Sequence, residues 1–405
     1  MNKWKRRFGA GLAATAVLLA AAVAGRAQQE PTNSIEALQR RLDGGALLAF
    51  DKSRGYLPAL LQAFAIPVSS QVLVFSGSSL QFNHISQKTP RAVYYQDDVS
   101  IGSVRGGQLI EIIASDKASG VAFYTLDVKQ AAKPKFERRG GECIICHGFT
   151  SRWAPGLIVA TTETGEGGKV LNLDPRNPFH LTDHRTPFEQ RYGGWYLTGN
   201  TGAMRHRGNV TMDAGDPTQT PPGGLNLASV KDRIDAAHYP EAGSDVVALL
   251  TLEHQAGFVN LVTRINAQYR GLNNREVSPG LRATQADIDT SLDELTDYMR
   301  FADEVRLPSP VKGSSGFAAT FAKLPPLDGQ GRSLRQFDLN TRLFRYPLSY
   351  MLYSQAFDNL RPEAKAIVLR RLYDELRKTP DGAAAINLAV ATKKGLPDYW
   401  QAMAQ

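Results

Sequence analysis

The sequence predicts an α+β protein with a β-rich N-terminal half and an α-helical C-terminal half. Segments rich in β-branched and aromatic residues, separated by Gly, Ser, Asp and Asn, fill positions 71–127 and indicate an antiparallel sheet. Beyond position 244, apolar residues recur at spacings of three and four, which is typical of amphipathic helices. The two cysteines of the chain lie at the junction of the halves, in the stretch "CIICH" at 143–147.

In the front half a helix is expected near 34–42, with Asn33 or Ser34 as its N-cap. The expected strands are "QVLVFS" (71–76), "RAVYYQ" (91–96), "QLIEIIAS" (108–115) and "GVAFYTLD" (120–127). Shorter strands are expected around 156–162 and 193–199. The long strands predict an antiparallel sheet, and the cysteine motif follows the last of them.

In the back half, "AGDPTQTPPGG" (214–224) predicts an exposed linker. The first helix is expected to be capped by Ser244. Its apolar stripe comprises Val247, Leu250, His254, Phe258, Leu261 and Ile265. A second helix places Ile288, Leu292, Leu295 and Met299 on one face. After a loop at 307–316, a third helix is expected at 361–378.

The first residues have the pattern of a secretory signal peptide: a basic start, an Ala/Leu/Val run and a small-x-small site at 25–27. The alternative is an uncleaved anchor, although the run is shorter than the ~20 residues that span a bilayer. No other segment is expected to cross a membrane. The predicted regions are therefore a signal peptide (1–27), a β-rich region (28–140), an attachment segment with pocket loops (141–213) and a helical region (225–405).

The charge of the chain depends strongly on the N-terminal segment. The net charge is +8, but five of the 47 basic residues and none of the acidic ones precede position 28. The remainder carries 42 basic and 39 acidic residues, a net charge of +3. This small excess gives no support to nucleic-acid binding. The 378 residues after position 27 exceed the ~100 residues of a small single domain severalfold.

The "CIICH" stretch predicts covalent attachment of one haem. Cys143 and Cys146 are spaced to reach the two vinyl groups of a porphyrin from one helical turn, and His147 then lies under the iron as proximal ligand. We expect His147 to donate its other ring N–H to a backbone carbonyl. "APGL" (154–157) resembles, with Ala154 in place of Gly, the loop that supports the proximal histidine in small class I cytochromes c; an ordinary Pro-Gly turn is the alternative. A disulfide or a structural zinc site are the alternatives; zinc would need a further ligand.

The second axial ligand is sought among the loops that follow. His206 is the preferred distal candidate, then Met204 and then His184, although solvated loop side chains are the alternative for each. His254 lies on the apolar stripe of a helix and is expected to face inward. A merely hydrogen-bonded imidazole explains it, and a catalytic role in the pocket is the other interpretation.

Several stretches together resemble one family. They are "TPRAVYYQDDVSIGSVRGG", "ECIICHG", "TDHRTPFEQRYGGWYLTG", "RHRGN", "LEHQAGFVNLVTR" and "GRSLRQFDLNTRLFRYPLSYMLYSQAFD". The chain resembles, over most of its length, a family of large exported monohaem c-type cytochromes whose reaction is not settled. The resemblance implies haem on Cys143, Cys146 and His147. The chain departs from the family at Thr201 and Arg207, where relatives carry His and Met.

These observations predict a periplasmic monohaem c-type cytochrome that transfers electrons. Its partner would be a redox protein or a small-molecule electron donor or acceptor. The alternatives are a haem enzyme of the peroxidase or oxidase type with an open distal site, and a haem-based sensor. The sequence contains no Walker loop, dinucleotide fingerprint or HExxH motif.

Overall fold

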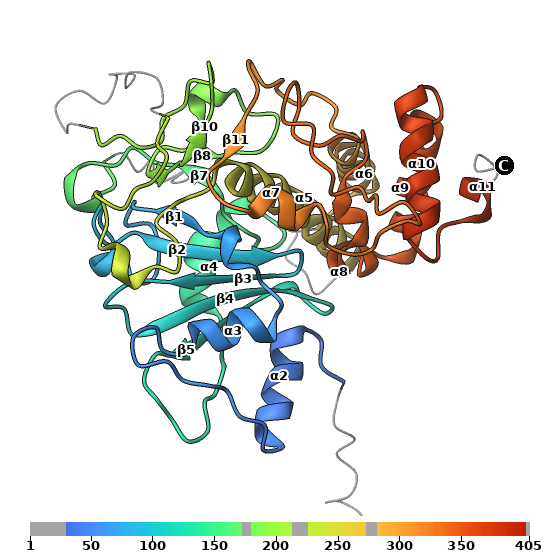
Figure 1. Ribbon diagram of the computed structural model, residues 1–405. Coiled ribbons are helices and arrows are strands. Elements are labelled where there is room, and N and C mark those ends of the chain that lie inside the picture. The colour runs from blue at the N-terminus through green and yellow to red at the C-terminus, as the bar shows by residue number, and fades with distance from the viewer. Residues whose placement is uncertain (1–29, 172–179, 213–225, 273–281, 402–405) are drawn as a thin grey trace, which may run out of the picture.

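The computed structural model describes residues 30–171, 180–212, 226–272 and 282–401. Within them a β-rich N-terminal half is joined to a helical C-terminal half (Figure 1), which confirms the predicted α+β class. The predicted signal segment at 1–27 and the predicted linker at 214–224 lie outside the described residues.

The front half is organised around a seven-stranded antiparallel sheet with strand order β6-β5-β4-β3-β2-β1-β9. The strands are β1 (Val72–Val74), β2 (Arg91–Gln96), β3 (Val99–Ser103), β4 (Leu109–Asp116), β5 (Gly120–Asp127), β6 (Glu137–Arg139) and β9 (Trp195–Tyr196). All four long predicted strands are present, two of them with the predicted ends. Strand β3 was not predicted, because "VSIGS" is short and contains two serines and a glycine, which strands disfavour.

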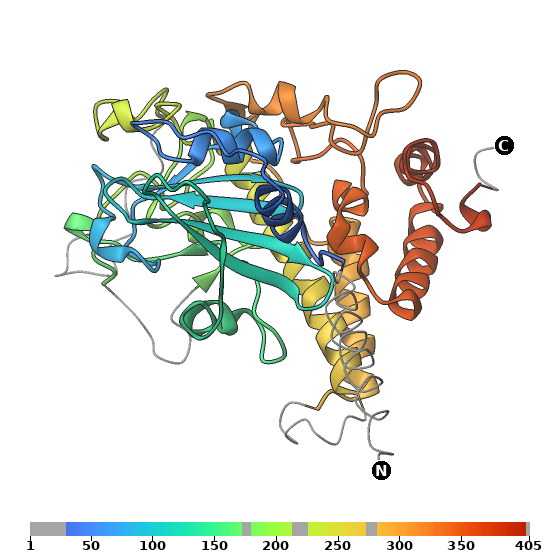
Figure 2. The ribbon, with the colours of Figure 1, turned by 90° about the horizontal axis from the view of Figure 1, so that it is seen from below.

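The two faces of the sheet pack against different helices, because successive side chains of a strand point to opposite faces. One face, with Tyr94, Ile101 and Ile112, forms a core with α2 (Ser34–Asp43) and α3 (Leu57–Ala63). The other face looks towards α4 (Gly141–His147), which Figure 2 shows on the opposite side of the sheet from α2 and α3. The sheet therefore separates the N-terminal helices from the "CIICH" helix.

Helix α2 begins at the first of the two predicted caps. The side-chain oxygen of Asn33 accepts hydrogen bonds from the backbone N–H groups of Ile35 and Glu36, both at 3.0 Å. Its amide nitrogen donates to Asp116 at 2.7 Å. Asn33 therefore both starts the helix and ties it to the end of β4.

The helical half consists of α5 (Val246–Gly271), α6 (Gln285–Met299), α7 (Phe317–Phe321), α8 (Gln355–Asp358), α9 (Pro362–Leu376), α10 (Pro380–Thr392) and α11 (Asp398–Gln401). The predicted apolar faces of α5 and α6 are buried in one core. The two helices pack side by side, and α5 also contacts β5 of the sheet. The third predicted helix, at 361–378, is present as α9.

The N-cap of α5 differs from the prediction. Asp245, and not Ser244, accepts hydrogen bonds from the backbone N–H groups of Val247 (2.8 Å) and Ala248 (3.1 Å). A carboxylate there also suits the positive end of the helix dipole. The hydroxyl of Ser244 instead accepts a hydrogen bond from the backbone N–H of Leu73 at 2.9 Å, which ties the start of α5 to β1.

Helix α5 is long and apolar enough to count as a candidate membrane span by length and composition, contrary to the expectation that no segment beyond the N-terminal one is so. However, 89% of its most apolar window is buried inside the protein. The packing of α5 between the sheet and the other helices accounts for its apolar character.

Two small ladders complete the fold. Strand β7 (Ala160–Thr161) pairs with β8 (His180–Leu181), and β10 (Gly199–Asn200) pairs with β11 (Lys312–Gly313). Strands β7, β9 and β10 fall in the predicted short strands, whereas β11 lies in a stretch that was predicted as loop. The β10–β11 ladder joins the segment after the "CIICH" motif to the helical half.

Candidate functional site

The "CIICH" motif occupies helix α4, which begins directly after the edge strand β6. Cys143, Cys146 and His147 are three and four positions apart, so a helix places them on one side. All three side chains line the same cavity. Helix α4 therefore presents two thiols and one imidazole to a single space, as the spacing predicts.

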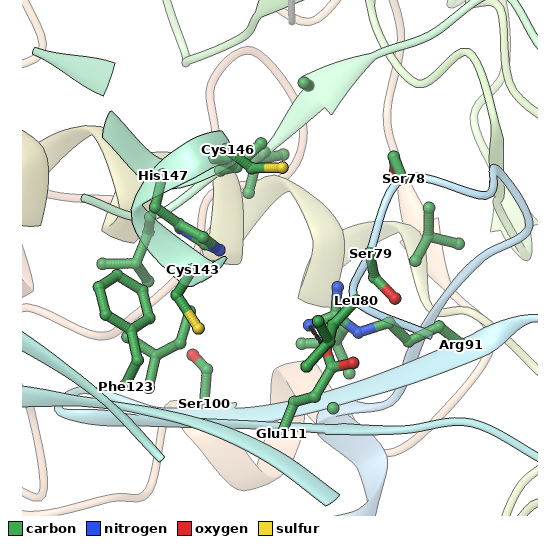
Figure 3. A pocket seen from close by; sticks show the side chains of 18 of the residues that line it. Ser78, Ser79, Leu80, Arg91, Ser100, Glu111, Phe123, Cys143, Cys146 and His147 are labelled. Carbon is green, nitrogen blue, oxygen red and sulfur yellow. Dashed lines mark ion pairs between the residues drawn. The ribbon is translucent and has the colours of Figure 1, made fainter. Parts of the chain in front are cut away.

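The cavity lies between α4 and the sheet and has a volume of about 340 Å³ (Figure 3). This volume is in the range of pockets that hold cofactors and small ligands, ~300–1,000 Å³. Its walls are mainly apolar and include Val74, Val93, Ile113, Phe123, Leu157, Val159, Trp195 and Leu252. Charged and hydroxyl side chains, Arg91, Glu111, Ser100 and Thr125, reach it from the sheet. A flat apolar group with polar ends suits such a space.

The ring of His147 is fixed in orientation by the loop that follows α4. Its Nδ1 lies 2.6 Å from the carbonyl oxygen of Gly156, and its ring centroid is 4.7 Å from that of Phe123. Burial lowers the pKa of His147 to about 4, so the imidazole is neutral near pH 7. A neutral ring that donates through Nδ1 keeps the lone pair of Nε2 for a metal ion. The expected contact to a backbone carbonyl, and its place in "APGL", are confirmed.

The Gly156 loop is held from the helical half by Asn260 of α5. The Asn260 side chain accepts a hydrogen bond from Leu157 N at 2.7 Å and donates one to Leu157 O at 2.9 Å. A Cβ atom on Gly156 would lie 2.1 Å from Asn260 Oδ1, so only glycine fits there. The sequence analysis did not predict a role for Asn260, since α5 contains several other polar residues and nothing local singles this one out.

The thiols have the opposite character to a redox-active pair. Both cysteines are free, and burial raises the pKa of Cys143 to about 11, with Glu142 adding repulsion. Burial also raises the pKa of Cys146. Catalytic CxxC pairs have lowered thiol pKa values instead. In the described part of the chain, no group of three or more His, Cys, Asp or Glu side chains is arranged to hold a metal ion.

The three distal candidates lie elsewhere. His206 is buried, and its Nδ1 accepts a hydrogen bond from Gly208 N at 3.1 Å. Met204 is buried in the core formed around α5, and His184 contacts His254. None of the three is among the residues that line the cavity. The structure therefore does not bring the preferred distal ligands to His147.

His254 faces inward, as its place on the stripe predicts. Its Nδ1 lies 2.9 Å from Nδ1 of His184, and its Nε2 lies 2.7 Å from the hydroxyl of Ser349. Tyr298 stacks on the His254 ring at 5.1 Å. Burial lowers the pKa of both histidines well below the usual value, so both are neutral. The adjacent Glu253 turns away to an ion pair with Arg191 at 2.8 Å. The two histidines, His184 and His254, are part of the packed core and do not line the cavity.

An ion pair in the cavity wall was not predicted. Arg91 Nη2 of β2 lies 3.1 Å from Glu111 Oε2 of β4. Figure 3 shows both side chains across the cavity from His147. The signal in the sequence is a glutamate between two pairs of apolar residues in "LIEII", but only the sheet register shows that Arg91 shares its face.

Comparison of the chain with protein-family models, with curated proteins and with solved structures gave no match. What the cavity binds must therefore be inferred from the residues that line it.

Proposed function

We propose that the chain is a c-type cytochrome that holds one haem through Cys143, Cys146 and His147 and transfers electrons in the periplasm. The observation that carries the proposal is the meeting of both thiols and the oriented His147 ring in one cavity. The N-terminal export pattern and the family resemblance agree with this function. The redox partner would be a protein or a small-molecule electron donor or acceptor.

The residues fit the group. Thioether links to Cys143 and Cys146 would anchor one edge of the porphyrin, and His147 Nε2 is free for the iron. The bound haem supplies one-electron redox chemistry. The chain orients the axial ring through Gly156 and excludes water with apolar walls such as Phe123 and Leu157.

One observation favours a second candidate, a haem enzyme or sensor with an open distal side. Among the described residues that line the cavity, His147 is the only histidine, and no methionine is present. All seven histidines of the chain belong to the described residues, and the internal segments outside them contain neither His nor Met. The usual second axial ligands of an electron-transfer haem, His and Met, are therefore absent from the described lining of the cavity apart from His147 itself.

Haem attachment is tested by intact-mass measurement on protein matured in cells that have a cytochrome c assembly system. The wild type should gain the mass of one haem and give a pyridine haemochrome spectrum. Cys143→Ser and Cys146→Ser should each lose one thioether link, and the double variant should lose covalent haem. Ile145→Ser, between the two cysteines and 70% exposed, is the matched control and should keep the haem. Wild-type protein without added mass would contradict the proposal.

Visible spectra of the matured protein separate the two candidates. A low-spin spectrum that cyanide and carbon monoxide leave unchanged means that both axial positions are filled, and favours electron transfer alone. A high-spin spectrum that responds to both ligands favours an open distal side. Peroxidase turnover with a generic electron donor then distinguishes an enzyme from a sensor.

A further inference from the structure

The Arg91–Glu111 pair lies in the wall of the cavity, across from His147 (Figure 3). Arg91 and Glu111 lie on the sheet face that also carries Val93, Ile113 and Phe123. Their side chains are 21% and 14% exposed. Charged groups in an apolar wall carry a desolvation cost, and such groups in clefts are frequent at functional sites.

The wall is shaped to hold the guanidinium group. Gly102 of β3 lies opposite Glu111 in the ladder and next to Arg91 on the cavity face. A Cβ atom on Gly102 would lie 2.7 Å from Arg91 Nε and 2.8 Å from Nη2. Glycine therefore leaves the space in which the side chain of Arg91 crosses β3 to reach Glu111.

Glu111 is positioned from its other side. The amide nitrogen of Gln81 donates a hydrogen bond to Glu111 Oε1 at 3.1 Å. The oxygen of the same amide accepts from the backbone N–H groups of Gln108 and Leu109 at 2.8 and 3.0 Å, which fixes the orientation of the amide. One carboxylate oxygen thus faces Gln81 and the other faces Arg91.

The guanidinium group keeps donors for a ligand. Nε and Nη2 lie against Gly102, and Nη2 pairs with Glu111. Within the described residues neither Nε nor Nη1 of Arg91 has a hydrogen-bond partner, and Nε is buried. Because two of the three nitrogens face the sheet, Nη1 is the donor that is left for a molecule in the cavity.

We infer that Arg91 and Glu111 form a binding site for a small protic ligand HX, such as hydrogen peroxide or hydrogen cyanide, that binds as its anion. The inference rests on the proposed haem attachment and on an open distal side. The H–X bond breaks heterolytically, the proton passes to the carboxylate of Glu111, and the electron pair stays on X⁻. Arg91 Nη1 donates a hydrogen bond to the anion. Charge balances, because one proton moves from the ligand to the protein.

The test measures cyanide binding to the ferric haem protein by stopped-flow absorbance. Glu111→Gln keeps the size and the Gln81 contact but removes the basic oxygen, and should slow cyanide association at least about 10-fold. Arg91→Met should accelerate dissociation about 10-fold, because a charged hydrogen bond is lost. Glu137→Gln, the same change at a carboxylate on β6 that is 60% exposed and does not line the cavity, is the matched control and should change neither rate. Carbon monoxide, which carries no proton, should bind all ferrous forms alike.

The outcomes separate this inference from haem attachment. If all variants contain haem and bind cyanide at wild-type rates, the inference is overturned and the cytochrome proposal stands. A wild-type haem protein that does not bind cyanide would likewise overturn the inference and leave the cytochrome proposal standing. If Arg91→Met loses haem while Glu111→Gln binds cyanide normally, Arg91 holds the haem itself and the inference is again overturned. Should both variants fail to fold, wild-type cyanide association in D₂O decides: equal rates in H₂O and D₂O would count against proton transfer to Glu111.

Discussion

Two histidine sites in this chain, half-buried His147 and fully buried His254, differ in what their second nitrogen meets. His147 in α4 uses Nδ1 for the carbonyl of Gly156 and turns its other nitrogen to a cavity of about 340 Å³. His254 in α5 uses both nitrogens inside the core, one towards His184 and one towards Ser349. Both rings are neutral, because burial lowers both pKa values.

The difference teaches that burial and neutrality alone do not identify a metal-ligating histidine. The Nε2 atoms of His184 and His206 are also buried without a hydrogen-bond partner in the described structure. What distinguishes His147 is that its second nitrogen lies beside two thiols at a cavity, which neither of the other two lines. The second site instead joins elements of the core: α5 carries His254, the β8-to-β9 segment carries His184, and Ser349 precedes the Tyr350–Tyr353 turn. The comparison indicates a structural role for the His184–His254 pair and supports His147 as the ligand in the proposed haem attachment.

The largest expected effect comes from replacing each of the two histidines by alanine and comparing the two variants. His254→Ala should lower the free energy of unfolding by about 3–5 kcal/mol, because it opens a cavity and leaves His184 and Ser349 without their partner. The visible spectrum of the haem should stay unchanged. His147→Ala should alter the Soret band by removing the axial nitrogen. Denaturant unfolding and absorbance spectra measure both; a changed Soret band in His254→Ala together with an unchanged one in His147→Ala would reverse the assignment.

A smaller effect is expected at the two asparagine clamps of α5. Asn260 binds the backbone of Leu157, and Asn266 binds the backbone of Asn359 and Arg361 with the same donor and acceptor geometry. Each change to Ala should cost about 1–3 kcal/mol of stability. Only Asn260→Ala should also shift the reduction potential of the haem, in the positive direction, because a looser Gly156 carbonyl makes the His147 ring less basic. Voltammetry of both variants checks this; equal potentials would show that the clamp does not act on His147.

The smallest effect is the pH dependence of stability from the core pair. The folded-state pKa values of His184 and His254 lie below the unfolded value near 6.5, so the unfolded chain binds protons first as the pH falls. Stability is therefore fully present above about pH 6.5 and decreases below it, with a slope of up to about 1.4 kcal/mol per pH unit for each histidine. Unfolding of His184→Gln between pH 8 and 5 should show a flatter slope. The exposed His238→Gln is the control and should keep the wild-type slope; an unchanged slope in His184→Gln would contradict the expectation.

Much of the fold follows from local patterns. Periodicity predicts the strands at 91–96 and 120–127 and the buried faces of α5 and α6. It succeeds there because residues close in sequence determine these elements. Strand β3 was missed because its pairing with β2 and β4, and not its composition, makes it a strand. The choice between Ser244 and Asp245 as cap depends on a contact to Leu73, far away in the sequence.

The residues of the candidate site divide in the same way, into those that the local sequence groups and those that only the fold brings together. Cys143, Cys146 and His147 could be grouped from the sequence because one helical turn contains them all. Arg91 and Glu111 could not, because their meeting depends on the register of three strands and on a glycine between them. The three distal candidates were chosen by residue type and proximity along the chain, and those criteria carry no information on which wall of the cavity a loop reaches.

The side-chain amide of Asn260 holds the backbone of Leu157, which lies 103 positions earlier in the chain. The loop beside His147 therefore depends on a distant part of the sequence. A shortened protein ending before α5 would retain strands β1 to β6 and the whole "CIICH" motif, yet nothing would fasten the loop beneath the axial imidazole. Such a fragment could carry porphyrin on its sulfur atoms while the ligand field of the iron stayed undefined. Under the proposed haem attachment, helix α5 thus belongs to the redox centre as much as the motif does.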